Sequence, residues 1–549
     1  MKITCIALAL GLLLGGADQA RAFEFDTVMV GGRPEGDPLG PELGSGVDYE
    51  FAGTFALNSA GQVAFSSSLA GSNVGADFAG IFRWTNGSKE LLARLDNQAP
   101  SLPSGVNNDS LFEFQLTPEI IDDGSVRISP LLAGAGVGSS NDRANVLIGP
   151  ANAATLIART GSPAPGTIAN YSSLLDFGGA TYLDPAGSVL VDGLLVGPGV
   201  SASNDRALWF GVPGNVQLLA REGGAAPLFG ATATFGSPDG NAVDVASGQA
   251  AFAVQIANGT SPGGILLGTP GSLTPAVETG SVAPGSGSTF NLFTSIDLNA
   301  TGHLALRATL ASNARALYAG QPNGLVLLAA EGTTAPGTSA NFSGASELID
   351  VFKFEQAESN DVAFIAGLSG DGVTADNNTG LWIYDGALTR LALREGDVAG
   401  DLADAFIGKI NAWTFNSDEN LVVLSDLAGP GVTDADNQAL WWVKPTGELE
   451  LIVRKGELFD VDPSSAADLR TVDSINLGGR PAFSSDGDAE TGSLNDGNLL
   501  GFGLSFNGFT STGIFTAKLV PEPTSLSMLL LAIVGVVRRR SGRLNDVIR

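Results

Sequence analysis

The sequence predicts an all-β protein built from eight tandem units of about 60 residues, arranged like the blades of a β-propeller. Three observations support this fold class. A turn motif with Asn and Gly recurs along the chain, and an apolar segment ending in Arg recurs with the same period. The chain also has 74 Gly and 27 Pro residues and is 44% hydrophobic, which suits many short buried strands separated by turns.

The turn motif is clearest in residues 57–65, and it recurs at 298–306 and 476–483. The remaining copies keep only part of the pattern. Aligned on the glycine of the turn, the eight copies fall at Gly61, Gly124, Gly187, Gly248, Gly302, Asn360, Glu419 and Gly479. The spacing stays between 54 and 63 residues, so we interpret the copies as one repeated structural unit.

Each unit contains two more apolar segments. One carries an aromatic residue, and these residues are Phe82, Trp209, Tyr318, Trp382, Trp441 and Phe515. The other ends in arginine, and these residues are Arg94, Arg159, Arg221, Arg394 and Arg454. Each unit is therefore expected to form three or four short strands. Such a sheet cannot bury both faces alone, but sheets repeated radially cover one another.

The two ends of the body predict how the ring closes. Residues 27–38 resemble an arginine strand and its turn, whereas the last unit ends near Phe515 without such a strand. We therefore expect the strand around Val28, Met29 and Val30 to complete the last unit beside Ile514. The competing architecture is an open β-solenoid or an array of small sheets.

Residues 1–22 have the pattern of a secretory signal peptide. Lys2 precedes an apolar run at 3–14, and Ala20-Arg21-Ala22 fits a cleavage site, so the mature chain would begin near Phe23. The single cysteine, Cys5, lies in this segment. The mature chain is thus expected to have neither a disulfide nor a cysteine-bound metal.

Residues 520–549 have the pattern of a sorting tail, which leaves 23–519 as the repeat body. Pro521, Glu522 and Pro523 precede an apolar run at 526–537. Three arginines, Arg538, Arg539 and Arg540, follow that run. As a helix the run spans only about 18 Å, less than the ~30 Å hydrocarbon core of a membrane. The arginines favour a cytoplasmic C-terminus before processing.

These tail residues resemble the PEP-CTERM sorting signal of Gram-negative bacteria that make exopolysaccharide, a tail also catalogued as "ice-binding protein C-terminal". The resemblance implies cleavage near Pro521–Pro523 by a membrane peptidase of the exosortase type. It further implies delivery to the cell envelope, the cell surface or the extracellular matrix. One departure is the stretch 541–549 after the arginines, which most such tails lack.

The body, over roughly residues 24–518, resembles a family of bacterial surface proteins with tandem NxxGxxAF repeats and a choice of anchor. The units at Asn58 and Asn476 fit the motif fully, and the unit at Asn299 departs only at Leu306. This family supplies no biochemical activity to carry over, so the resemblance implies a surface location and no reaction.

Charge restricts the partners of the body. Without residues 1–22 and 521–549 the chain has 21 basic and 54 acidic residues, a net charge of −33. Such a body repels nucleic acid and anionic lipid and attracts cations and basic partners. The expected partners are the sorting peptidase and, at the surface, exopolysaccharide or other surface proteins. Membrane contact is expected only through the tail before processing.

The sequence points to a non-enzymatic binding or structural protein with no catalytic residue and no cofactor. His303, the single histidine, occupies the position of Gln62 at a strand start. No nucleophile elbow, zinc-protease motif or P-loop is present. The repeated arginines can line a ligand ring, but they more often tie a strand end to a turn. A secreted glycosidase or lyase acting on matrix glycans stays the alternative, because 54 carboxylates offer many pairs.

Two acidic loops offer a possible Ca²⁺ site. Segments 370–378 and 429–437 match each other and contribute Asp371, Asp376, Asp434 and Asp436. Closely spaced oxygen donors suit calcium, which is abundant outside cells. The spacing fits neither an EF-hand nor a nonapeptide repeat, and an ordinary turn is the more common structure for such a segment.

Overall fold

The structure is a computed structural model that describes residues 23–33, 40–111, 118–174, 181–343, 353–357, 359–463, 467–478, 493–508 and 510–519. The chain separates into two compact units. The larger, Asp26–Thr516, is the repeat body, and the smaller joins Met1–Phe25 with Ala517–Arg549. The predicted signal peptide and sorting tail lie outside the described residues. Among the described residues, no helix is long and apolar enough to cross a membrane.

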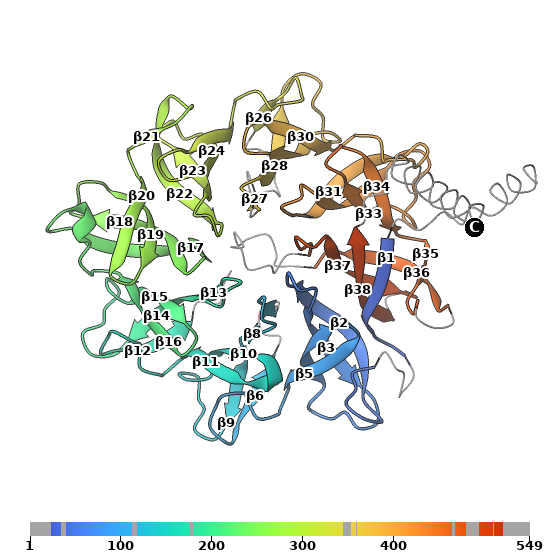
Figure 1. Cartoon of the computed structure of the whole chain (residues 1–549), viewed down its shortest axis with the longest axis horizontal. Helices are drawn as coiled ribbons and strands as arrows, with labels where there is room; N and C mark the ends of the chain where they lie inside the picture. Colours follow the sequence, from blue (N-terminus) through green and yellow to red (C-terminus); the bar gives the residue numbers. More distant parts are fainter. Residues whose placement is uncertain are drawn as a thin grey trace, which may run out of the picture. The chain divides into compact units, whose positions relative to one another are not determined.

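The body is an eight-bladed β-propeller, in which consecutive antiparallel sheets follow one another around a ring (Figure 1). The first four blades contain these strands: blade 1, β2 (Asp48–Leu57), β3 (Val63–Ala70), β4 (Ala79–Thr85) and β5 (Ser88–Arg94); blade 2, β6 (Val106–Ser110), β7 (Glu119–Ile120), β8 (Val126–Ile128), β9 (Leu131–Gly134), β10 (Ala144–Ile148) and β11 (Ala154–Arg159); blade 3, β12 (Asn170–Leu174), β13 (Thr181–Leu183), β14 (Val189–Val196), β15 (Arg206–Val212) and β16 (Asn215–Arg221); blade 4, β17 (Thr234–Ala246), β18 (Gln249–Ala257), β19 (Gly263–Thr269) and β20 (Ser272–Glu278).

The other four blades contain these strands: blade 5, β21 (Val282–Ala283), β22 (Ser288–Leu298), β23 (Leu304–Leu310), β24 (Arg315–Gly320) and β25 (Val326–Ala330); blade 6, β26 (Asn341–Ser343), β27 (Lys353–Gln356), β28 (Val362–Ser369), β29 (Thr379–Tyr384) and β30 (Thr389–Arg394); blade 7, β31 (Phe406–Phe415), β32 (Leu421–Ala428), β33 (Gln438–Val443) and β34 (Leu449–Arg454); blade 8, β35 (Leu458–Asp460), β36 (Leu469–Asn476), β37 (Leu499–Phe506), β38 (Ser511–Leu519) and β1 (Phe23–Val30). In the described loops, two single-turn 3₁₀ helices span Pro150–Asn152 and Pro227–Phe229.

The predicted closure of the ring is confirmed. Strand β1 pairs with β38 and so becomes the last strand of blade 8. The N–H of Gly31 donates to the carbonyl of Thr512 at 2.7 Å, which extends this pairing beyond β1. The predicted all-β propeller of eight units is therefore correct, and the open solenoid is wrong.

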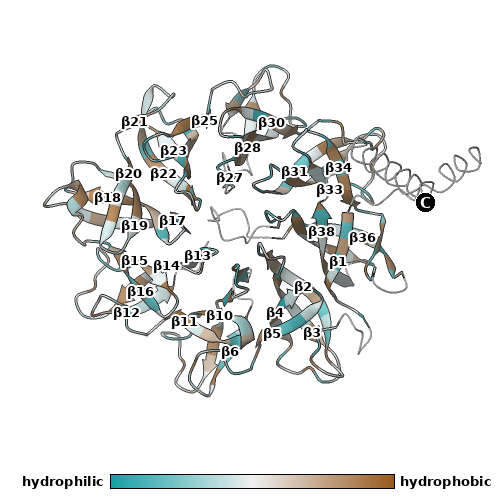
Figure 2. Cartoon of the chain, viewed as in Figure 1, coloured by the Kyte–Doolittle hydropathy of each residue, from teal (hydrophilic) through white to brown (hydrophobic). Residues whose placement is uncertain are grey.

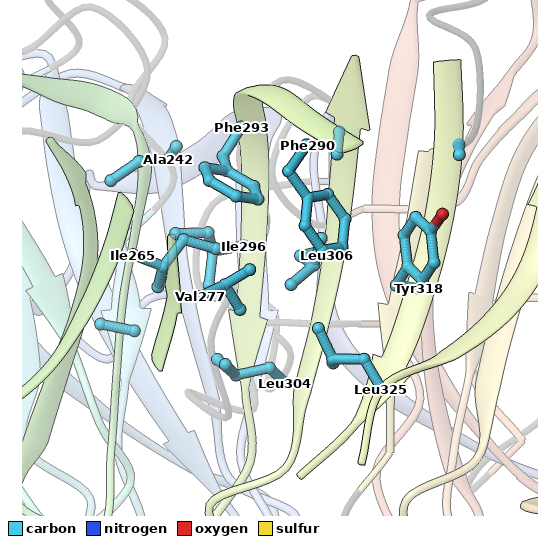
Figure 3. Packing of buried hydrophobic residues seen from close by; sticks show 14 of the residues in the cluster. Ala242, Ile265, Val277, Phe290, Phe293, Ile296, Leu304, Leu306, Tyr318 and Leu325 are labelled. Carbon is cyan, nitrogen blue, oxygen red and sulfur yellow. The ribbon is translucent and has the colours of Figure 1, made fainter. Parts of the chain in front are cut away.

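Hydrophobic residues recur in the strands of every blade (Figure 2), and most of the core lies between blades. Figure 3 shows the cluster between blades 4 and 5, where Ile265 and Val277 face Ile296 and Leu304. All four side chains are buried. Neighbouring blades therefore cover apolar faces of one another.

The predicted aromatic residues form a repeated packing unit. In five blades an aromatic ring of β4, β15, β24, β29 or β38 meets, edge to face, a ring of β2, β12, β22, β26 or β35 of the same blade. The pairs are Tyr49–Phe82, Tyr171–Trp209, Phe290–Tyr318, Phe342–Trp382 and Phe459–Phe515, with centroids 4.7–5.2 Å apart. Such pairs contribute roughly 0.5–1.5 kcal/mol beyond the area they bury, which explains why the period of the aromatic residues follows that of the blades.

Candidate functional site

The five repeated arginines all make the same hydrogen bond. Each Nε–H donates to a backbone carbonyl in a loop of its own blade: the β3–β4, β9–β10, β14–β15, β28–β29 or β32–β33 loop. The pairs are Arg94–Asp77, Arg159–Asn141, Arg221–Asn204, Arg394–Asn377 and Arg454–Asp436, at 2.8–2.9 Å. The arginines therefore tie a strand end to a turn, and their Nε–H groups do not project from the ring toward a ligand.

The loop residues that receive these bonds also close their own turns. In blade 3 the Asn204 side chain accepts the N–H of Ser201 and donates to the carbonyl of Gly199. The corresponding Asn141 and Asn377 make the same two kinds of bond. The Asn or Asp in these loops is thus a turn residue that bonds its own backbone.

The four aspartates of the predicted calcium site lie in two different blades. Asp371 and Asp376 are exposed in the β28–β29 loop, and Asp434 is exposed in the β32–β33 loop. Asp436 is engaged within its loop: Oδ1 accepts from the N–H and hydroxyl of Thr433, and Oδ2 pairs with Arg454 at 2.6 Å. Those backbone and hydroxyl hydrogen bonds hold the pKa of the Asp436 carboxyl below its usual value.

Within the part of the chain that the structure describes, no three Asp, Glu, His or Cys side chains converge to hold a metal ion. The internal bonds of Asp436 favour the ordinary-turn interpretation of its loop. The calcium prediction itself stays a prediction, which thermal denaturation with and without added calcium would test.

The two acidic loops and the connection between them form one surface, which we call the acidic loop surface. The connection 395–405 passes between the loops: a Cβ on Gly396 would lie 3.3 Å from the Asp376 carbonyl, and one on Gly429 would strike the Asp404 carbonyl. Asp401 and Asp404 add exposed carboxylates to those of the loops. The surface thus presents five exposed carboxylates, those of Asp371, Asp376, Asp401, Asp404 and Asp434.

The repeated asparagine of the turn motif links one blade to another. Asn58 is buried, accepts the N–H of Gln62 on Oδ1, and donates from Nδ2 to the carbonyl of Ile121 in blade 2 at 2.9 Å. Asn299 makes the corresponding bonds to His303 and to Ala357 of blade 6. The motif therefore has a structural role at the blade junctions.

The eighth copy of the motif was assigned to the wrong residues. Asn476 is the last residue of β36, and most of the predicted copy lies in 479–492, outside the described residues. The junction role belongs to Asn495: its Oδ1 accepts the N–H of Leu499, and its Nδ2 donates to the carbonyl of Asn58 at 2.8 Å. The segment between β36 and Asn495 lengthens this unit and hid the true copy.

Sequence reasoning did find the other seven turns. The aligned residues Gly61, Gly124, Gly187, Gly248, Gly302, Asn360 and Glu419 all have positive φ, between 56° and 92°. In the eighth blade this conformation belongs to Asn498, with φ 59°. A search for Asn-x-x-Asn in place of Asn-x-x-Gly would have found it.

His303 lies at a strand start, as predicted, and is partly buried. Its Nδ1 is 2.8 Å from the Thr301 hydroxyl and 3.2 Å from the side-chain nitrogen of Gln321, and the Thr301 hydroxyl also lies 2.7 Å from Asn360 Oδ1 in blade 6. Burial lowers the pKa of His303 below its ordinary value. The ring belongs to a polar network at the junction of blades 5 and 6.

The sorting residues Pro521, Glu522, Pro523, Arg538, Arg539 and Arg540 lie outside the described residues.

Among solved structures, similar folds occur in propellers of different activity. The β-propeller domain of the Trilobed protease from Pyrococcus furiosus has a TM-score of 0.35 and 10% identity, with 75% of this chain and 100% of that chain covered. An acylaminoacyl peptidase from Pyrococcus horikoshii has a TM-score of 0.36 and 12% identity, with 83% and 58% covered. The Aleuria aurantia lectin has a TM-score of 0.24 and 11% identity, with 62% and 94% covered.

This chain spans little more than half the length of the peptidases it matches. No curated protein matches the sequence. One family model matches residues 57–527, which is most of the chain, and its description is "Family of unknown function (DUF7453)". The described part of that match extends from the end of β2 through β38. By this match, the chain belongs to the DUF7453 family.

Proposed function

We propose that this protein is an exported, non-enzymatic surface or matrix protein whose propeller serves as a binding or structural module. In this proposal a signal peptide, 1–22, directs export, and a PEP-CTERM tail, 520–549, is cut by a peptidase of the exosortase type. The product resides in the cell envelope, on the cell surface or in the extracellular matrix of a Gram-negative bacterium. Exopolysaccharide or other surface proteins are its partners there.

One observation carries the structural part of the proposal. The polar residues that recur around the ring make recurring structural hydrogen bonds: Arg94 and its equivalents bond loop carbonyls, and Asn58 and its equivalents bond the next blade. Repetition in this chain therefore supports rigidity. A rigid ring with exposed loops suits a scaffold or binding role.

The composition of the ends supports the export part. The signal and tail patterns stand at opposite ends of a body whose mature portion has no cysteine. Intact-mass analysis of the protein isolated from the cell surface tests this part. We expect a chain that begins near Phe23 and ends near Pro521–Pro523. A surface protein that still begins at Met1 and ends at Arg549 would contradict the proposal.

The acidic loop surface gives the binding role a test. We expect a chain with Asp371, Asp376, Asp401 and Asp404 changed to Asn to fold as the wild type does, because all four side chains are exposed. The variant should detach from the matrix fraction at lower salt if basic groups bind there. Equal retention of both proteins at every salt concentration would show that the acidic loop surface does not bind the matrix.

A further inference from the structure

We infer that the edge of blade 5 formed by β25 is a self-association surface, where β25 pairs antiparallel with β25 of a second copy of this chain. Such pairing goes beyond the proposed function and is independent of export and of the sorting tail. Three observations carry it: the sequence of one edge strand, the exposure of its side chains and the distribution of charge around the ring.

Strand β25 lies at the edge of its sheet. It follows β24 in the strand order, and β24 is its one partner among the described strands. One side of β25 therefore presents backbone N–H and C=O groups that the described strands do not pair. A row of such groups is a template for a further strand.

The edge strands at the same place in the other seven blades each carry a charged residue or a proline. Those strands are β1, β5, β11, β16, β20, β30 and β34. Strand β25 reads Val326-Leu327-Leu328-Ala329-Ala330 and has neither. Because charges and prolines keep an edge strand from pairing with another chain, β25 lacks the protection that the other seven have.

Two positions of β25 depart from the repeat. Val326 forms the second pair after the bulge in its ladder, and it is 46% exposed. The residues that form this pair in six other blades are all polar: Glu90, Thr155, Gln217, Thr274, Arg390 and Glu450. Ala330 stands where β5, β11, β16, β30 and β34 end in arginine. A charge at either place would bring like charges together in a pair of identical strands.

A neighbouring hairpin adds apolar surface to this edge. The turn between β21 and β22 lies against β25, since a Cβ on Gly285 would be 3.3 Å from the Leu327 Cβ. Val282, three residues before Gly285, is 76% exposed. Three residues of chain span at most about 11 Å. The hairpin and β25 thus contribute exposed apolar side chains, Val282 and Val326, to neighbouring parts of one surface.

The charge distribution indicates which partner fits. Residues 279–330, which contain most of blade 5, hold Arg307 and Arg315 against Asp297, a net charge of +1. Residues 331–454, which contain blades 6 and 7, hold 20 acidic and 6 basic residues, a net charge of −14. A basic partner is therefore attracted to blades 6 and 7 more than to blade 5. A second copy, itself strongly acidic, is repelled least at blade 5.

The geometry limits the size and strength of the assembly. Two identical antiparallel strands related by a twofold axis occupy both edges, so association ends at two copies. A pair of five-residue strands buries less than the roughly 1,000 Å² of a stable interface, so the dimer should be weak. A cell surface or matrix, where copies are held close together, would favour it.

Sedimentation equilibrium of the purified protein tests the inference, at concentrations up to about 200 μM because the interface is small. The variant Val326→Glu places a carboxylate where blade 7 has Glu450. Its matched control, Gln217→Glu, makes the same change at the same ladder position of blade 3. Both side chains are exposed, so both variants should melt like the wild type.

We expect the wild type and Gln217→Glu to show the same monomer–dimer equilibrium. The dissociation constant of Val326→Glu should be at least about tenfold higher, because each copy then brings a carboxylate into the pair. Added salt should strengthen the wild-type dimer, because it screens the repulsion between two acidic bodies.

Cross-linking provides a second measurement that does not depend on Val326→Glu. Residues 23–519 contain no cysteine, so Val326→Cys and Gln217→Cys each add one thiol to the body. With a bifunctional thiol reagent we expect a cross-linked dimer from Val326→Cys and none from Gln217→Cys.

A wild type that stays monomeric at every concentration would overturn the inference. Equal weakening by the two glutamate variants, or equal cross-linking of the two cysteine variants, would overturn it as well. If the wild type is monomeric and Val326→Glu is lost from the matrix fraction, β25 binds a different partner and self-association is wrong.

Discussion

Individual polar residues in this protein each stabilise one blade junction or one turn. Arg221 illustrates the rule, because its Nε–H donates to the Asn204 carbonyl at 2.8 Å and four other blades repeat the bond. A sequence shows that such an arginine recurs but not whether its side chain points to a ligand or to a loop. The direction of the Arg221 side chain depends on the β14–β15 loop, whose conformation the sequence leaves open.

We expect Arg221→Gln to lower the free energy of unfolding by about 1–2 kcal/mol, because a half-buried loop carbonyl loses a charged donor. Urea denaturation measures this change. Lys409→Gln provides the control, since Lys409 is exposed, and its effect should stay within about 0.5 kcal/mol. Equal, small effects of the two changes would show that the arginine bond contributes nothing.

His303 should make stability depend on pH. Its pKa is lowered in the folded chain because burial disfavours the charged ring. The unfolded chain therefore binds the proton more readily, and stability that is full above about pH 6.5 is lost as the pH falls below that value. In His303→Gln, which places the Gln62 residue of blade 1 in blade 5, this loss should be absent. Melting temperatures of both proteins at pH 7.5 and 5 test it, and parallel decreases would contradict it.

At the scale of elements, every blade junction contains one identical backbone bond. A residue just after the last strand of one blade donates its N–H to a carbonyl in the first strand of the next blade or, in blades 5 and 8, in the second strand. The pairs are Gly32–Tyr49, Asp96–Asn108, Gly161–Tyr171, Gly223–Phe235, Gly280–Phe290, Gly332–Phe342, Gly396–Ile407 and Gly456–Val472, at 2.7–3.0 Å. All eight donors have positive φ, which favours glycine. The bond from Gly32 shows that the N-terminal segment 23–33 continues the repeat.

Substitutions at two of these glycines distinguish the cost of the backbone conformation from the cost of steric overlap. A Cβ on Gly161 would lie 2.8 Å from the Asn141 Cβ, whereas a Cβ on Gly332 would meet nothing within 4 Å. Gly332→Ala should cost only the conformational term, about 1–2 kcal/mol. Gly161→Ala should cost more, because a neighbour must also shift. Gly332→Asp should cost less than Gly332→Ala, since Asp96 adopts this conformation naturally in blade 1. Chemical denaturation of the three variants gives the order, and a reversed order would contradict the assignment.

The elements also show how far the sequence alone could reach. Seven of the eight turn positions were predictable, because Gly, Asn or Glu occupies the same positive-φ site at a steady spacing. The eighth was missed, because the unit is longer than the others and residues 476–483 match the motif at the expected spacing. In blade 2, the pairing of β6 with β9 as a separate two-stranded sheet was also missed. Pro130, between β8 and β9, has no N–H for the ladder and marks that interruption in the sequence.

At the scale of the whole body, ring closure explains the pattern of strands at the two ends of the repeat body. The ring has no free first or last blade, because β1 and β38 belong to the same sheet. A spare strand at the N-terminus and a missing strand at the C-terminus were visible in the sequence, and both follow from the period. The hydrogen bonds between blades were not predictable, because they join residues about 60 positions apart, such as Asn58 and Ile121.

The measurement that tests this account most directly is the stability of a body without residues 23–33, which we call the latch. A chain beginning at residue 34 lacks β1 and the Gly32–Tyr49 junction. We expect its entire unfolding transition to move to lower temperature, since blade 8 loses a strand and the ring loses one of eight junctions. A control chain with Glu24→Ser and Asp26→Ser keeps β1, because both side chains are exposed, and should melt like the wild type. A latch-deleted chain that melts at the wild-type temperature would contradict the closed ring.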